Sequence, residues 1–242
     1  MGNSGTPINT GTLTNDHASL TNNGLLTNTD TLSNVSTLTN TGIIVGTGTY
    51  IQTANEFAVN SQTINNGSLT QSSVIINGGT LSGTGTITAN VTIGSGATVS
   101  PGNPFGTLTI NGNFASSGNI LFEIGGRSAG QFDVLAIHGN AFLNGGTIGF
   151  NFMNFIPAIG NSWDFLTASS ISGWDSLSFN FSGLGAGETA QFHFHHGIET
   201  LRIVGAPHQS TLAMVAVPEP SSLLHLLFGL GGLAVWRKLK GV

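Results

Sequence analysis

The chain has 242 residues, of which only 6% are charged, and its formal net charge is −5. Soluble domains usually carry about 25% charged residues, so solubility here must come from Gly, Asn, Ser and Thr. No Lys or Arg precedes Arg127, which excludes a nucleic-acid-binding surface along the first half, and the absence of Cys excludes disulfides and thiol ligands.

The first residues carry no export signal. A secretory signal begins with a basic region and a short apolar core, and the segment Met1–Thr6 has neither. Because the C-terminal pattern described below requires export, we expect the given start to be truncated or misassigned.

A six-residue unit repeats through the first fifty residues. One apolar residue in six is too sparse for a helix stripe or for a meander with one buried face. It suits a coil whose faces each contribute a short strand, an inward Leu and a turn built on Asn with Gly or Asp, since Asn and Gly tolerate the left-handed conformation. The apolar positions are Leu13, Leu20, Leu26, Leu32, Leu38 and Ile44.

Three such units make a coil of about eighteen residues, and coils stacked at about 4.8 Å bury a continuous apolar column. We therefore predict an all-β fold, a parallel β-helix, for residues 1–115. The strict six-residue period is also compatible with the left-handed hexapeptide form. The longer units downstream favour the right-handed form.

The units lengthen after Gly78 but keep the same organisation. The segments Gly79–Ile87, Ala97–Asn103 and Gly106–Gly112 resemble the coil repeats of autotransporter passenger domains. This resemblance continues, as a pattern without a site, to about residue 205.

From residue 116 to 205 we predict longer, aromatic strands that pass into an antiparallel cap. The alternation over Phe192–His195 predicts Phe side chains pointing inward and His side chains pointing outward. The predicted strands are Ile120–Ile124, Phe132–His138, Thr147–Phe152, Trp163–Thr167, Leu177–Phe181, Gln191–His195 and Thr200–Val204. Residues 206–217 are expected to form a linker.

The sequence offers little catalytic chemistry, and we predict no catalytic residue, cofactor or metal. His193, His195 and His196 form a metal-like cluster without a Cys or an adjacent carboxylate, so we interpret them as solvent-facing strand residues. The remaining candidates, Asp133, Asp164 and Asp175, are scattered along the chain. Polysaccharide lyases and hydrolases with β-helices need clustered acids and bases, so that class stays only as an alternative.

The C-terminal segment, residues 218–242, has three parts in a fixed order. An extended motif comes first, because the two prolines disfavour helix. A short apolar helix and a basic end follow. The motif residues are Val217, Pro218, Glu219 and Pro220. The predicted membrane span contains Leu223, Leu224, Leu226, Leu227, Phe228, Leu230, Leu233, Val235 and Trp236. The basic anchor is Arg237, Lys238 and Lys240.

This order resembles the PEP-CTERM sorting signal of Gram-negative bacteria. The resemblance implies an exported protein held in the inner membrane through its C-terminus and processed by an exosortase, a membrane-embedded cysteine transpeptidase. The protein would then reach the cell surface or the extracellular matrix. A structural or adhesin-like role in a biofilm matrix is the expected function, with exopolysaccharide as a candidate partner. The alternative is a secreted β-helix that binds or degrades polysaccharide.

Overall fold

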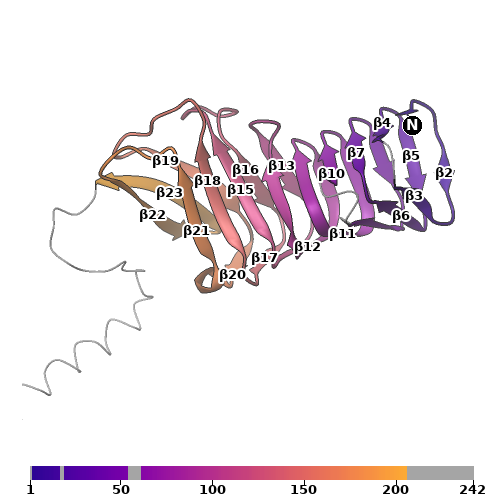
Figure 1. The fold of residues 1–242 in the computed structure, drawn as a ribbon. Coiled ribbons are helices and arrows are strands. Elements are labelled where there is room, and N and C mark those ends of the chain that lie inside the picture. Colours follow the sequence, from indigo (N-terminus) through magenta and orange to yellow (C-terminus); the bar gives the residue numbers. More distant parts are fainter. Residues whose placement is uncertain (1, 17–18, 54–60, 206–242) are drawn as a thin grey trace, which may run out of the picture. The chain divides into compact units, whose positions relative to one another are not determined.

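The computed structural model describes residues 2–16, 19–53 and 61–205. The predicted linker and the whole C-terminal segment lie outside these residues. The described residues all belong to one compact unit, Met1–Ala206. Within it, short strands pair in parallel from coil to coil and form a stack with three faces (Figure 1). The predicted all-β, parallel β-helix-like fold is confirmed, while its handedness stays a prediction.

The first face is parallel throughout and runs the length of the unit. In chain order it contains β1 (Gly2–Asn3), β4 (Ser19–Asn22), β7 (Thr37–Asn40), β10 (Gln62–Asn65), the last parts of β11 (Ser68–Gly83) and β12 (Thr86–Pro101), β15 (Asn119–Ile124), β18 (Thr147–Phe152) and β21 (Ser178–Ser182).

The second face is parallel until its last two strands, which are antiparallel. It contains β2 (Ile8–Asn9), β5 (Leu25–Asn28), β8 (Ile43–Val45), the first parts of β11 and β12, β13 (Thr107–Ile110), β16 (Val134–Ile137), β19 (Ser162–Thr167), β23 (Ile198–Gly205) and β22 (Glu188–His195).

The third face is again parallel, and it is followed by a short 3₁₀ turn, η1 (Trp174–Ser176). It contains β3 (Leu13–Asn15), β6 (Thr31–Asn34), β9 (Thr49–Gln52), the middle parts of β11 and β12, β14 (Phe114–Ser116), β17 (Asn140–Leu143) and β20 (Ser170–Ser172).

The coils lengthen along the chain. Leu20 lies beside Leu38 in the register of the first face, whereas Phe150 lies beside Phe181, so one turn of the stack grows from about eighteen residues to about thirty. The parallel coils continue well beyond residue 115. Only the pairs β19–β23 and β22–β23 are antiparallel among the described strands.

Three columns of apolar side chains fill the interior, one behind each face. Alternation in the strands sends every second side chain inward, and parallel register puts it above its counterpart in the previous coil. On the second face this column joins Leu26, Ile44, Leu69, Ile87, Ile110 and Ile137, all at most 3% exposed. The predicted inward leucines are confirmed, except that Leu13 is only half-buried because it belongs to the first coil of the stack.

Buried Asn side chains stack at the corners, where we had predicted left-handed turns. Asn22, Asn28, Asn34 and Asn40 end their strands with side chains at most 1% exposed. Among the described non-glycine residues, only Asn154 and His196 have a positive φ. The corner interpretation of Asn was therefore wrong. The amide is needed inside the coil, where it satisfies buried polar groups that an apolar side chain would leave unpaired.

Each corner column forms a hydrogen-bonded ladder. Asn3 Nδ2 donates to Asn22 Oδ1 over 2.6 Å, Asn22 to Asn40 over 2.8 Å, and Asn40 to Asn65 over 2.8 Å. The second amide proton reaches a backbone oxygen of the following coil, as from Asn40 to Ser68 O at 3.1 Å. The ladders thus fix the coil register as well as the corner.

An aromatic cluster closes the far end of the stack. Phe192 of β22 contacts rings from the first face, from β19 of the second face and from η1, so β22 crosses the end of the interior. Its ring centroid lies 4.4 Å from Phe179, 5.3 Å from Trp174, 5.7 Å from Phe150 and 6.1 Å from both Phe165 and Phe181. Phe194, predicted to point inward, is 51% exposed because it lies beside the His196–Gly197 turn at the edge of this hairpin.

Candidate functional site: outer faces and the C-terminal motif

The outward side of the first face carries an unbroken column of uncharged polar residues. They are exposed or half-buried, and each lies next to its counterpart in the following coil. The column runs through Ser19, Thr37, Gln62, Thr80, Thr98, Asn119, Thr147 and Ser178. Its hydroxyl and amide groups repeat at the strand spacing of about 4.8 Å. Such a surface can form hydrogen bonds to a neutral, hydroxylated polymer but offers no charge for catalysis.

On the third face, outward Asn side chains are already used between coils. Asn90 Oδ1 accepts the Asn113 N–H at 3.0 Å, Asn113 Oδ1 accepts the Asn140 N–H at 2.9 Å, and Asn140 Oδ1 accepts the Ser170 hydroxyl at 2.9 Å. These side chains stabilise the stack. On the first face Asn119 Oδ1 likewise accepts the Thr147 N–H at 3.1 Å, but the polar column there runs the length of the unit, so we take this face as the candidate for contacts with another molecule.

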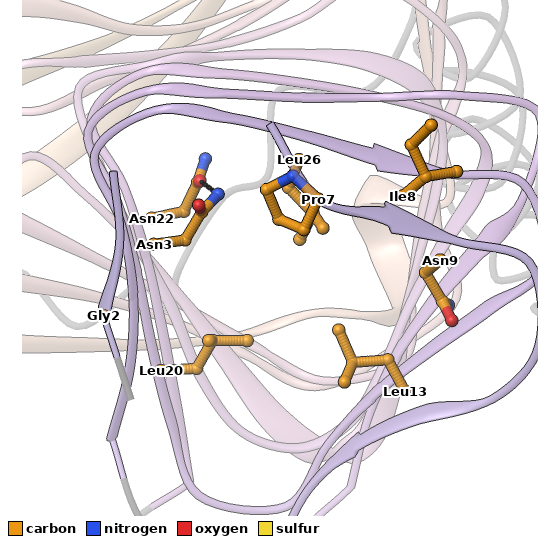
Figure 2. A pocket seen from close by; sticks show the side chains of 9 residues that line it. All are labelled: Gly2, Asn3, Pro7, Ile8, Asn9, Leu13, Leu20, Asn22 and Leu26. Atoms are coloured by element: carbon orange, nitrogen blue, oxygen red, sulfur yellow. Dashed lines mark hydrogen bonds between the residues drawn. The ribbon is translucent and has the colours of Figure 1, made fainter. Parts of the chain in front are cut away.

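A pocket of about 400 Å³ opens at the first coil (Figure 2). Leu13, Leu20 and Leu26 supply its apolar wall, and the stacked amides of Asn3 and Asn22 line one corner. It contains no titratable side chain and is the end of the same interior that the columns fill. We assign it no chemistry.

The three histidines lie together at the edge hairpin. The His195 and His196 rings are 3.8 Å apart between centroids, and those of His193 and His195 are 6.4 Å apart. All three are exposed. Within the part of the chain that the structure describes, no group of three His, Cys, Asp or Glu side chains is arranged to hold a metal ion.

Asp133 has a structural position that sequence reasoning did not identify. It is fully buried, its Oδ1 accepts the Gly106 N–H at 3.1 Å, and its Oδ2 accepts the Glu123 N–H at 2.8 Å. Burial raises the pKa of Asp133 to about 8, although the two backbone donors act in the opposite direction. A Cβ on Gly102 would lie only 2.4 Å from Asp133 Oδ1. The carboxyl group therefore fastens the loop after β12 to β15.

The other carboxylates are dispersed. Asp164 accepts a hydrogen bond from the Thr200 hydroxyl at 2.5 Å, and Asp175 is exposed on η1. Glu199 points inward from β23 and is 4% exposed. Burial raises the pKa of Glu199 to about 7.

A polar cluster interrupts the apolar columns. Tyr50, Gln52 and Thr63 are fully buried, and the Thr63 hydroxyl bonds to both the Tyr50 hydroxyl and Gln52 Oε1. Burial raises the pKa of Tyr50 above its ordinary value. Because the cluster lies inside the stack, it is structural. The only sign of this cluster in the sequence is Thr63, which takes the inward position that Leu38 occupies in the previous coil.

The predicted motif Val217–Pro220, the apolar span and the basic anchor all lie outside the described residues. The helices found in the described part of the chain include none long and apolar enough to span a bilayer.

The comparison with known families bears on that C-terminal segment. Residues 216–240 match the model of the PEP-CTERM protein-sorting motif, which covers about a tenth of the chain. No curated protein matches the sequence. The matched segment contains the three predicted parts in their predicted order, so the chain carries a PEP-CTERM protein-sorting motif and is, by that motif, an exported protein sorted by an exosortase.

Proposed function

We propose that this chain is a structural, adhesin-like component of a bacterial surface or extracellular matrix. An exosortase would process it at or beside Pro218–Glu219–Pro220 and so release the coil stack to the outside. The observation that carries the proposal is the sorting motif at residues 216–240, joined in one chain to a stack whose first face carries a column of uncharged polar residues.

The properties of the stack suit this role. Neighbouring coils are joined by backbone pairing, by the Asn ladders and by the apolar columns, and these contacts hold the register of the unit. Its polar column presents the same neutral groups coil after coil. A weak contact repeated along such a column gains strength through multivalency.

Binding of a neutral exopolysaccharide without turnover is the form of adhesion that the first face favours. Asp133, Asp164 and Glu199 do not face one substrate, because Asp133 and Glu199 are buried and Asp164 is exposed. Acid–base cleavage of a glycosidic bond needs two carboxyl groups facing one substrate. We therefore propose a protein without enzymatic activity.

Before processing, the segment after the motif would hold the chain in the inner membrane with Arg237, Lys238 and Lys240 on the cytoplasmic side. The eight Leu, Phe and Val residues between Leu223 and Val235 contribute about −2 to −5 kcal/mol to insertion. His225 and three glycines oppose insertion. We expect a nearly balanced equilibrium in which the basic anchor matters.

The first prediction tests this sorting reaction. A reporter inserted before Ala206 is followed in a host with its exosortase and in one without it. The wild-type chain should lose the segment after the motif and release the reporter to the surface or matrix only when the exosortase is present. Glu219→Ala should remain full-length in the membrane, while the neighbouring substitution Ser222→Ala should be processed normally. Identical processing of the wild-type and Glu219→Ala chains would refute the proposal.

A further inference from the structure

One loop of the coil stack displays two apolar side chains to water. The isoleucine loop, residues 153–161, joins β18 to β19, and its Ile156 and Ile159 are 81% and 65% exposed. No charged residue occurs between Met153 and Trp163. Two large aliphatic side chains exposed three residues apart on one surface loop are typical of an interaction site.

The loop has a fixed shape. Asn161 accepts the Ala158 N–H at Oδ1 over 3.0 Å and donates its own N–H to Ala158 O over 2.9 Å. β23 holds the same turn, because Gly160 donates to Ile203 O at 2.8 Å and Ile203 donates to Asn161 O at 2.9 Å. Phe155 packs against Trp163 with ring centroids 6.0 Å apart. The isoleucines are thus displayed by a braced turn.

The two arginines of the described residues flank this loop. Arg202 lies opposite Ser162 in the register of β23 and β19, and it is exposed. Arg127 is exposed on a neighbouring loop. The Trp163 indole N–H donates a hydrogen bond to Gly126 O of that loop at 2.8 Å. Among the acids of this end, Asp164 accepts a hydrogen bond from Thr200 and Glu188 accepts one from the Gly185 N–H. Elsewhere the described surface has no cation.

This end of the stack is also where the chain continues toward the sorting motif. A Cβ on Gly205, the last described residue, would lie 3.3 Å from Ile159 Cδ1. The strands β19, β22 and β23 lie at the end opposite β2 (Figure 1). The described unit therefore ends beside the isoleucine loop.

We propose that the isoleucine loop is a contact site for an anionic phospholipid surface. Ile156 and Ile159 enter the interfacial layer, while Arg127 and Arg202 contact headgroup phosphates, the combination by which peripheral segments bind membranes. The inference rests on the proposed membrane-held state before processing. Tethering raises the effective concentration of lipid at the loop, so a weak contact suffices to orient the stack.

The second prediction is tested with one fluorophore at a time on the full chain. Because the chain has no Cys, Ile156→Cys introduces a unique labelling site, and Ile8→Cys is the matched control, an isoleucine 69% exposed at the opposite end. With vesicles of phosphatidylglycerol and phosphatidylethanolamine, an environment-sensitive label at 156 should shift to the blue and be quenched at least threefold more by nitroxide lipids than a label at 8. Phosphatidylcholine vesicles, or Arg127→Gln with Arg202→Gln, should reduce that quenching.

Two arms separate this inference from the sorting proposal. Flotation with the vesicles reports membrane association of the full chain as a whole, to which the C-terminal segment contributes. A C-terminal histidine tag on nickel-chelating lipid keeps the full chain at the surface even if that segment does not bind. Equal emission shifts and equal quenching of the labels at positions 156 and 8 in the tethered chain would overturn the lipid site. A blue shift at 156 without vesicles would also overturn it, because the loop would then be covered by the chain itself.

Discussion

Asn40 and Asn23 are the same residue type in the same repeat region, but they differ in burial and in hydrogen bonding. Asn40 is 1% exposed, accepts from Asn22 and donates to Asn65 and Ser68 O. Asn23 is exposed and accepts only the Thr41 hydroxyl at 2.7 Å. A buried amide that loses its hydrogen-bond partners keeps the full cost of desolvation. An exposed amide replaces a hydrogen bond to protein with one to water. The ladder of hydrogen bonds therefore explains why Asn recurs at this position of the unit.

The third prediction follows from that contrast. Asn40→Ala should lower the free energy of unfolding by about 2–4 kcal/mol, because Asn65 Oδ1 and Ser68 O lose a buried donor. Asn23→Ala should change it by less than about 0.5 kcal/mol. Urea unfolding followed by far-UV circular dichroism measures both. Equal effects at the two positions would show that the ladder adds nothing to ordinary strand pairing.

Glu199 gives the fourth prediction, a dependence of stability on pH. Burial raises its pKa from 4.5 to about 7, so the folded chain binds more protons than the unfolded chain between these values. Its contribution is fully present below pH 4.5 and is lost as the pH rises through 7. Asp133, with a raised pKa of about 8, acts in the same direction.

Glu199→Gln keeps the shape of the side chain and removes this titration. The fall in unfolding free energy between pH 5 and pH 8.5 should become smaller by about 1 kcal/mol, a value already reduced for solvent screening. The exposed carboxylate of Asp175 offers a control, since Asp175→Asn removes no buried charge. A steeper pH dependence in Glu199→Gln would contradict the assignment.

At the scale of elements, the six-residue period predicted the strands well because the period itself determines two things. It puts one apolar residue into each short strand and one corner after it, so the columns of Leu and Ile follow directly. Glycine completes the corner: a Cβ on Gly42 would lie 2.2 Å from Gly24 O, and one on Gly67 would lie 2.0 Å from Gly42 O. Close stacking of backbones, rather than a positive φ, explains these glycines.

Other features could not be read from the period. A Leu-Thr-Asn unit is compatible with Asn at a left-handed corner and with Asn inside the coil, and only stacking decides between them. The exposure of Phe194 depends on where the hairpin leaves the interior. The isoleucine loop gathers Arg127 and Arg202, which are far apart in sequence. The sorting motif, in contrast, is linear, so its residues could be recognised without a fold.

At the scale of the whole described unit, stability depends mainly on contacts between neighbouring coils along one axis. Each coil contacts its two neighbours, so local damage spreads along the stack only through the next coil. The aromatic cluster around Phe192 joins rings from the first face, the second face and η1 at the end of the stack. It replaces the coil that would otherwise cover the last rings.

The fifth prediction concerns this closure. Phe192→Ala removes ring contacts with Phe150, Phe165, Trp174, Phe179 and Phe181 and should cost about 3 kcal/mol locally. Because coils depend on their neighbours, amide hydrogen exchange measured by mass spectrometry should accelerate at least tenfold in β18 and β21 and stay unchanged in β4 and β7. Phe194→Ala, at an exposed position of the same strand, should leave all four strands protected. If Phe192→Ala accelerates exchange equally in every strand, the unit unfolds as one cooperative block, and β22 is not a local cap.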